Sequence, residues 1–270
     1  MKTKKDLLKK VFKIRCSAIG DIMTEPKNAI TEKQLLQIKE LQAKKEMTDK
    51  QKDTLFSLIC KRDNPELSQT TKGYCKNWLK SQMLNRKLEF TSKYTDKGII
   101  MEDTAIDFIA EYLKLGMLFK NEISKEDDYM MGTNDVDIPN LIIDIKNSWS
   151  WETFPLLELK LPEYKYWWQM QGYLHLFNKN RGKVIYVLSD TPQHLIEREA
   201  RNYCFFNGYE EMDMDIYNEF HKKLTYQDLP DNYKIKIFDV EKDKKSIEKV
   251  KKRVIECRKY IETLIKELDL

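Results

Sequence analysis

Apolar residues in the first third of the chain recur at helical spacing. Two segments each open on a capping box, formed by Thr31 with Gln34 and by Thr48 with Gln51. Their apolar positions are Leu35, Ile38 and Leu41 in the first, and Leu55, Leu58 and Ile59 in the second. Polar residues 43–46 separate the segments, so the pattern predicts a helical hairpin, followed by a third helix over residues 74–84.

A stronger helical pattern covers residues 98–116, with Gly116 as the expected terminator. Its apolar stripe consists of Ile99, Ile106, Ile109 and Leu113. Glu102 falls on the same stripe. A carboxylate on a core-facing stripe is costly to bury unless another group pairs with it. Glu102 either has such a partner or lies at the edge of the stripe and reaches solvent.

Residues 133–138 and 141–147 predict two strands joined by the turn pair Pro139-Asn140. In a two-residue hairpin, the pleat sorts the side chains onto two faces. The apolar face, which must be core, carries Val136, Ile138, Leu141, Ile143 and Ile145. The other face carries Thr133, Asp135, Asp137, Ile142, Asp144 and Lys146.

This register places Asp135 opposite Asp144, with Cβ atoms about 5 Å apart, where like charges destabilise a sheet. A divalent cation between them removes the repulsion, and Lys146 projects toward the same place. With Glu102 as a possible third acid, the oxygen ligands suit Mg²⁺ or Mn²⁺. The alternative is a solvent-facing hairpin with one Asp-Lys pair, which leaves the second aspartate unpaired. The repulsion predicts that neutralising either aspartate raises the stability of the metal-free protein.

Residues 164–177 predict a helix on which Gln169 and Tyr173 share a face. Its core positions are Trp167, Trp168, Leu174 and Phe177. Gln169 is not explained by packing, because an amide on a half-buried face needs a partner. A β-branched and aromatic stretch, 183–188, predicts a further strand, so the core is mixed α/β.

The C-terminal segment has apolar residues spaced alternately three and four apart, as in a heptad seam. The seam consists of Ile247, Val250, Val254, Cys257, Ile261, Leu264 and Leu268. It suits either a coiled coil with another chain or docking onto the same domain. We favour docking, because the seam spans few heptads.

Composition narrows the class of protein. The chain has 270 residues, 41% of them hydrophobic, and a formal net charge of +4, which permits a polyanionic partner without demanding one. No apolar stretch approaches the about 20 residues of a membrane helix, and no signal-peptide core follows the Lys-rich start, so neither a secreted nor a membrane protein is expected. Five scattered cysteines favour reduced thiols, and only three histidines leave the chemistry to carboxylates and lysine.

Four motifs in this order resemble the PD-(D/E)XK nuclease superfamily, and within it the phage-type recombination exonucleases of the lambda exonuclease/YqaJ group, related to the RecB nuclease domain. They are Glu102, Gly132-Thr-Asn-Asp135, Asp144-Ile-Lys146 and Gln169-Met-Gln-Gly-Tyr173. The match covers residues 98–188. The third acidic position is often Glu in this family and is Asp144 here. The hairpin over residues 31–62 has no counterpart in the family.

The resemblance implies a restriction-endonuclease-like α/β (α+β) fold, with a mixed central sheet flanked by helices. It would form a single domain with a mainly helical part (1–95), a catalytic core (96–200) and a C-terminal helical part (201–270). The implied metal ligands are Glu102, Asp135, Asp144 and the carbonyl of Ile145. Lys146 would orient or deprotonate a water or stabilise developing charge, and Gln169 and Gln171 would steer the lysine or a phosphate.

The resemblance also suggests DNA contacts. Residues 15–23 are similar to the segment with which such exonucleases approach a DNA end. Candidates for holding a terminal phosphate or contacting DNA are Arg15, Ser17, Thr133, Gln171 and Tyr173. Trp149 or Trp151 would stack on an unpaired base, unless this loop simply closes over the strand ends.

The implied function is a Mg²⁺- or Mn²⁺-dependent exonuclease that degrades one strand of linear duplex DNA for phage-type recombination or repair. The alternatives are a structure- or sequence-selective endonuclease on the same fold, and a non-catalytic DNA-binding protein. A Cas4-like enzyme is disfavoured, because the chain lacks the cysteine cluster. By analogy, the expected partners are a single-strand annealing protein and further copies of the chain in a trimeric ring, and the expected location is the cytoplasm of a bacterial host of a phage or prophage.

Overall fold

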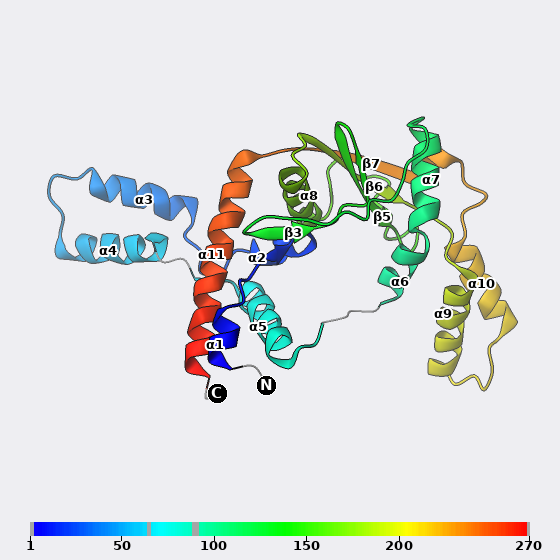
Figure 1. Cartoon of the computed structure of the whole chain (residues 1–270), viewed down its shortest axis with the longest axis horizontal. Coiled ribbons are helices and arrows are strands. Elements are labelled where there is room, and N and C mark those ends of the chain that lie inside the picture. Colours follow the sequence, from blue (N-terminus) through cyan, green and yellow to red (C-terminus); the bar gives the residue numbers. More distant parts are fainter. Residues whose placement is uncertain (1–2, 64–65, 88–91, 269–270) are drawn as a thin grey trace. The chain divides into compact units, whose positions relative to one another are not determined.

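The computed structural model describes residues 3–63, 66–87 and 92–268. The chain divides into two compact units, and each is described by itself (Figure 1). The first unit consists of Met1–Phe12, Asp21–Arg86 and Val250–Leu270, and the second of Lys13–Gly20 and Lys87–Lys249.

The first unit is helical. It contains α1 (Lys4–Leu8), α3 (Glu32–Gln42), α4 (Asp49–Asp63), α5 (Gln69–Leu84) and most of α11 (Lys244–Glu267). Helices α3 and α4 form the predicted hairpin, and both predicted capping boxes are present. The Thr31 hydroxyl accepts from the amide of Gln34 at 3.2 Å, and the Thr48 hydroxyl accepts from the amide of Gln51 at 3.4 Å. Helix α5 begins earlier than predicted, because Ser68 caps it.

Helix α11 buries its apolar seam within the chain. The buried residues are Ile247, Val250, Val254, Cys257, Ile261 and Ile265. The prediction of docking within one chain is therefore confirmed. Near the end of the helix, Ile265 is the buried residue, whereas the sequence pattern predicted Leu264. A hydrogen bond with the Cys75 thiol of α5, followed by burial, raises the pKa of the Cys257 thiol.

The second unit is built on a mixed four-stranded sheet. Its strands, in spatial order, are β4 (Val136–Ile138), β5 (Leu141–Asn147), β6 (Arg181–Val187) and β7 (Ile235–Glu241). The central pair β5–β6 is parallel, and the two outer pairs are antiparallel. The predicted hairpin is confirmed with its two-residue turn and its register, in which Val136 pairs with Ile143 and Ile138 with Leu141. Strand β4 starts only at Val136, so the first strand is shorter than predicted.

Helices cover both faces of this sheet, chiefly α7 (Glu102–Tyr112) on one and α8 (Tyr164–Leu176) on the other. Helix α6 (Lys93–Ile100) precedes α7, and α9 (Gln193–Phe206) and α10 (Met214–Leu224) pack on one another. The predicted apolar face packs on α7, with Ile143 and Ile145 in one cluster with Ile106. Helix α8 covers the opposite face, where a side chain at Gly182 would collide with Met170. Figure 1 shows the two helices on either side of the strands.

Short elements complete the second unit. They are β1 (Ile14–Arg15), η1 (Cys16–Ala18), β2 (Lys125–Glu126), β3 (Met130–Gly132) and η2 (Asp231–Tyr233), with α2 (Ile19–Ile22) beginning at its edge. Strands β1, β3 and β2 form a small sheet in that order, in which β1 is parallel to β3. Strand β3, which lies just before β4 in the sequence, is therefore paired with β1, more than a hundred residues earlier.

The single helix predicted over residues 98–116 is wrong, because Met101 interrupts it between α6 and α7. Ile99, expected in the core, is 66% exposed, whereas Lys97 is fully buried. The Lys97 ammonium donates to the carbonyls of Trp149 at 3.1 Å and Ser189 at 2.6 Å. These hydrogen bonds stabilise Lys97 in the interior. The helix face that carries Ile99, which the apolar pattern predicted to be buried, is exposed instead.

The end of α7 also differs from the prediction. Lys114, and not Gly116, takes the left-handed conformation directly after the helix, with φ 53°. The amide of Leu115 then donates back to the carbonyl of Ala110 at 3.0 Å, as in a Schellman motif. Gly116 also has positive φ, but it lies beyond this cap.

All five cysteines are free thiols, and all but Cys60 are buried. In the described ranges, no helix is long and apolar enough to cross a membrane.

Candidate active site

Strand β5 carries Asp144 and Lys146 on the sheet face that α8 covers. The Asp144 side chain is 1% exposed, and its Oδ2 lies 2.8 Å from Nζ of Lys146. The alternative of a solvent-facing hairpin is therefore wrong, because the carboxylate is buried. A buried carboxylate is stable only where charged or hydrogen-bonding groups surround it.

Helix α8 supplies one of those groups. Gln169 is buried, and its Nε2 donates to Oδ1 of Asp144 at 3.0 Å and to the hydroxyl of Tyr173 at 3.0 Å. The amide that packing did not explain thus has the acid of the neighbouring strand as its partner. Gln169 fixes the orientation of the Asp144 carboxylate.

Asp135 reaches the same place from the segment just before β4. Its Oδ2 accepts a hydrogen bond from the amide of Ile145 at 2.6 Å, between Asp144 and Lys146 in the sequence. The amide of Asn121 donates to the Asp135 carbonyl at 2.7 Å. Asp135 is therefore held beside the middle of β5, which carries Asp144, by one side-chain and one backbone hydrogen bond.

The two carboxylates and the ammonium shift one another's pKa values. Burial, followed by the charge of Asp144, raises the pKa of Asp135 to about 7, although Lys146 opposes the shift. Burial lowers the pKa of Lys146, but the charges of Asp144 and Asp135 outweigh it and leave the pKa raised. Without a bound cation, Lys146 is thus an ammonium that balances only part of the negative charge.

The residues present fit a divalent cation. Oδ2 of Asp144 is buried and accepts no hydrogen bond in the part of the chain that the structure describes. The Lys146 ammonium lies 2.8 Å from this oxygen, so a cation that binds there would take the place of the ammonium at Oδ2. Asp135, Asp144 and a backbone carbonyl are hard oxygen ligands, and Mg²⁺ keeps several waters beside one or two carboxylates. The site offers two carboxylates and not three. In residues 3–63, 66–87 and 92–268, no group of three or more His, Cys, Asp or Glu side chains could hold a metal.

Glu102 is not brought into this group. It is the first residue of α7, and its Oε2 lies 2.6 Å from Nζ of Lys120. Its charge is the weakest of the named effects on the pKa of Asp135. Of the two interpretations of Glu102, the structure therefore favours a paired carboxylate, and its pairing is with Lys120.

Residues 15–20 of the segment expected at the DNA end belong to the same unit as this site. Cys16 sits against two glycines, and a Cβ at Gly132 or Gly172 would approach its sulfur to 2.9 Å or 2.8 Å. Arg15 and Ser17, on either side of Cys16, are exposed, as is Thr133. These three side chains are thus accessible, and their role with a terminal phosphate stays a prediction.

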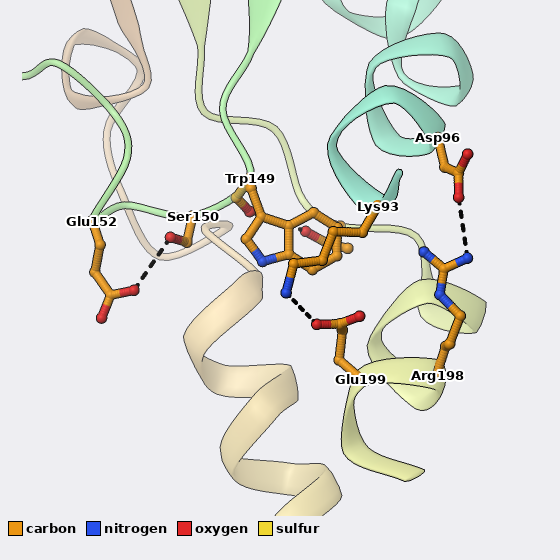
Figure 2. Close-up of polar contacts among 8 residues, drawn as sticks. Lys93, Asp96, Trp149, Ser150, Glu152, Arg198 and Glu199 are labelled. Carbon is orange, nitrogen blue, oxygen red and sulfur yellow. Dashed lines mark hydrogen bonds and ion pairs between the residues drawn. The ribbon is translucent and has the colours of Figure 1, made fainter. Parts of the chain in front are cut away.

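The two tryptophans after β5 differ sharply. Trp149 is 8% exposed and packs with Leu195, Ile196 and Leu224. Figure 2 shows its indole beside Lys93, which pairs with Glu199 of α9. Trp149 thus closes over the strand ends. Trp151 is 58% exposed, so only this indole is free to meet a base.

Figure 2 also shows the two ion pairs that connect α6 to α9 around this indole. Beside the Lys93–Glu199 pair, Nη1 of Arg198 lies 3.1 Å from Oδ2 of Asp96. The Lys93 ammonium lies 5.0 Å from the centroid of the Trp149 ring. The two ion pairs therefore connect α6 to α9, and the Lys93 ammonium lies against the indole.

Gln171 and Tyr173 do not have the expected DNA-facing positions. Gln171 is fully buried; its Nε2 donates to the Glu241 carbonyl at 2.8 Å and its Oε1 accepts from the Asp243 amide at 2.7 Å. Gln171 is two residues from Gln169, so it points to another side of α8. Its hydrogen bonds stabilise the backbone at the end of β7. Tyr173 is 4% exposed and its hydroxyl is engaged by Gln169.

Two aromatic residues at the site were missed by the sequence analysis. The Tyr166 ring centroid lies 4.5 Å from Nζ of Lys146, and Tyr186 of β6 pairs in register with Lys146. Tyr166 precedes Gln169 by three residues on the same face of α8, which was a usable pattern. Nothing in the sequence gives the register of β6 against β5.

Comparison with solved structures shows the fold. The chain is similar to a phage-related exonuclease from Haemophilus somnus 129PT, with 24% identity, a TM-score of 0.68, and coverage of 96% of this chain and 97% of that chain. It is also similar to LHK-Exo in complex with dAMP, with 13% identity, a TM-score of 0.54, and coverage of 98% and 95%. LHK-Exo is an alkaline exonuclease from Laribacter hongkongensis.

The chain has a mixed α/β fold similar to that of these solved exonuclease structures, with a mixed sheet flanked by helices as in a restriction-endonuclease-like fold. The mixed α/β architecture predicted from the sequence is thereby confirmed. No protein-family model matches the sequence, and no curated protein matches it.

Proposed function

We propose that this protein is a metal-dependent exonuclease that hydrolyses one strand of linear duplex DNA from an end. The observation that carries the proposal is the convergence of Asp135, Asp144 and Lys146 at β5, with Gln169 fixing the orientation of Asp144. Two structures of the same fold are exonucleases, and one of them was solved with dAMP, a mononucleotide of the kind such an enzyme releases.

Each residue has a distinct part in the proposed reaction. Asp135, Asp144 and the carbonyl of Ile145 would hold Mg²⁺ or Mn²⁺, which when bound polarises the scissile phosphate and lowers the pKa of a water. Lys146 would orient the attacking water and stabilise the charge that develops on the phosphoryl oxygens. Gln169 keeps Asp144 from rotating. Glu102 would act only after releasing Lys120, so we assign it no ligand role.

The test uses end-labelled linear duplex DNA, incubated with Mg²⁺ and with EDTA, beside covalently closed circular DNA of the same sequence. The proposal expects mononucleotides from the linear DNA with Mg²⁺ only, and an intact circle. Cleavage of the circle would support the alternative, an endonuclease on this fold. Binding without cleavage of either DNA would support a non-catalytic protein. Comparing 5′-phosphate with 5′-hydroxyl ends tests whether Arg15, Ser17 and Thr133 hold a terminal phosphate.

Trp151 gives a separate prediction. Because its indole is exposed, Trp151→Ala is expected to weaken binding of a frayed DNA end about five- to tenfold, the loss of one base–aromatic stack. The melting temperature should stay nearly constant. Fluorescence anisotropy with a labelled duplex measures the affinity. Phe205→Ala is the control, since Phe205 is 77% exposed on α9. Equal affinities of both variants and the wild type would remove Trp151 from the DNA contacts.

The role in recombination or repair, a single-strand annealing partner and a trimeric ring are parts of the same proposal that rest on the family likeness alone. Light scattering of the purified chain measures the number of copies directly. A monomer that degrades linear DNA would remove the ring from the proposal and leave the chemistry intact.

A further inference from the structure

Tyr186 carries a buried hydroxyl that has no hydrogen-bond partner among the described residues. The residue is 7% exposed and lies in β6, next to the strand that carries Asp144 and Lys146. A buried hydroxyl without a partner is destabilising, and such groups in folded proteins call for a reason. The proposed nuclease mechanism does not use this residue.

Sheet geometry places Tyr186 and Lys146 side by side on neighbouring strands. Strands β5 and β6 are parallel, and Lys146 pairs with Tyr186 in register. Paired residues of neighbouring strands project from the same face, so both side chains lie under α8. A lysine and a tyrosine side chain are of similar length, so a change of the Lys146 rotamer can bring its ammonium to the Tyr186 hydroxyl.

Tyr166 of α8 connects the two side chains. Its ring centroid lies 4.5 Å from Nζ of Lys146 and 6.2 Å from the centroid of the Tyr186 ring, at an interplanar angle of 71°. Burial raises the pKa of Tyr186, and the neighbouring Tyr166 hydroxyl and the carboxylates of Glu163 and Asp144 add to this shift. The Tyr186 hydroxyl therefore belongs to the electrostatic environment of the site.

In the metal-bound site, the Lys146 ammonium and the metal ion would compete for one oxygen of Asp144. Oδ2 of Asp144 is the atom that Lys146 Nζ approaches to 2.8 Å, and it is also the buried oxygen to which we assign the cation. An ammonium and a divalent ion at one carboxylate oxygen repel each other. When a metal binds there, the Lys146 ammonium needs another acceptor close by. A tyrosine hydroxyl has the lone pairs to serve as one.

We propose that the Tyr186 hydroxyl accepts a hydrogen bond from the Lys146 ammonium when a divalent ion occupies the site. Tyr186 is then a positioning residue, which keeps Lys146 beside the reacting phosphate after the metal has taken Asp144. The inference rests on the proposed metal-dependent function and extends it to a residue of the neighbouring strand.

The test compares Tyr186→Phe with the wild type in thermal melts over a Mg²⁺ titration. Without metal, the melting temperature of the variant is expected to equal or exceed that of the wild type, because the lost hydroxyl had no partner. The Mg²⁺ concentration needed for half of the stabilisation is expected to rise about three- to tenfold, as one hydrogen bond to a charged group is lost. An unchanged Mg²⁺ dependence, or a lower metal-free melting temperature, would overturn the proposal.

A double-mutant cycle separates positioning from general packing. In the background of Lys146→Met, Tyr186→Phe should leave the Mg²⁺ dependence unchanged, because the ammonium that the hydroxyl serves is gone. A full effect of Tyr186→Phe in that background would contradict the proposal. Tyr226→Phe is the matched control. Its hydroxyl accepts from the amide of Trp151 and donates to the carbonyl of Lys223, so its loss should lower the melting temperature equally with and without Mg²⁺.

The outcomes also separate this inference from the proposed function. If the wild type shows neither Mg²⁺-induced stabilisation nor cleavage, the proposed function and the inference both fall. If the wild type shows both, and Tyr186→Phe responds to Mg²⁺ as the wild type does, only the inference falls.

Discussion

Replacing Lys146 with alanine is expected to reduce Mg²⁺-dependent cleavage of linear duplex DNA by about a thousandfold or more, as for other groups that stabilise transition-state charge or transfer protons. Nζ of Lys146 is the only ammonium paired with Asp144 in the described part of the chain, at 2.8 Å. Its loss removes the cation that would face the developing charge on the phosphate. Asp144→Asn is expected to abolish cleavage as well, because it weakens the metal ligand.

The measurement is the initial rate of mononucleotide release from end-labelled duplex, with DNA binding followed by anisotropy. Both variants should still bind DNA, and circular dichroism in Mg²⁺ should show them folded. Lys183→Met is the matched control, since this lysine of β6 pairs with Asp239 and lies on the opposite side of the sheet. Wild-type rates from either Lys146→Ala or Asp144→Asn would refute the site assignment.

Neutralising Asp135 is expected to stabilise the metal-free protein at pH 8. Its pKa is raised to about 7 by burial and by the charge of Asp144, so ionisation of Asp135 opposes folding. At about 1.4 kcal/mol for each pKa unit, with partial solvent access reducing the effect, Asp135→Asn should add about 1–3 kcal/mol. In a chain of this size that raises the melting temperature by several degrees. The asparagine oxygen can still accept from the Ile145 amide, so the local backbone is preserved.

The dependence on pH follows from the raised pKa. Asp135 contributes stability that is fully present below about pH 4, where the carboxyl is protonated in both the folded and unfolded states. That contribution is lost as the pH rises through about 7. Melting temperatures of the metal-free wild type should therefore fall relative to those of Asp135→Asn across this range. Saturating Mg²⁺ should reverse the order of the two proteins, because only the wild type retains both ligands. Identical pH profiles would contradict this assignment.

The sequence predicted that neutralising either aspartate stabilises the metal-free protein. From the structure we expect this stabilisation for Asp135 only. Asp144 already has Lys146 and Gln169 as partners. Neutralising it leaves the Lys146 ammonium unpaired in a largely buried place, which is destabilising. Asp144→Asn should therefore not raise the melting temperature at pH 8, and this contrast with Asp135→Asn is visible in one set of melts.

The hairpin could be predicted because local rules determine it. A two-residue turn fixes the pairing of the strands, and alternation of apolar and polar residues fixes which face is buried. Together they placed Asp144 and Lys146 side by side before any tertiary contact was known. Gln169 could be predicted in part, because a neutral amide on a helix face required a partner.

Other features depend on contacts that no local pattern encodes. Lys120 lies in an irregular segment, so its ion pair with Glu102 left no trace in the periodicity. Lys97 faces inward from α6 because its ammonium donates to carbonyls just beyond the ends of two strands. Tyr186 was missed because a whole helix connects β5 to β6, and no turn fixes their register.

The second unit is not one continuous stretch of sequence. Residues 13–20 belong to it, although residues of the other unit flank them on both sides. Strand β1 completes the small sheet beside β3, and Cys16 fits against the two glycines that have no room for a side chain. A protein shortened to begin at residue 87 would thus lose β1 of the small sheet, together with those helices of the first unit that precede residue 87. Any attempt to produce the second unit alone must keep this octapeptide, joined by a linker or supplied as a separate chain.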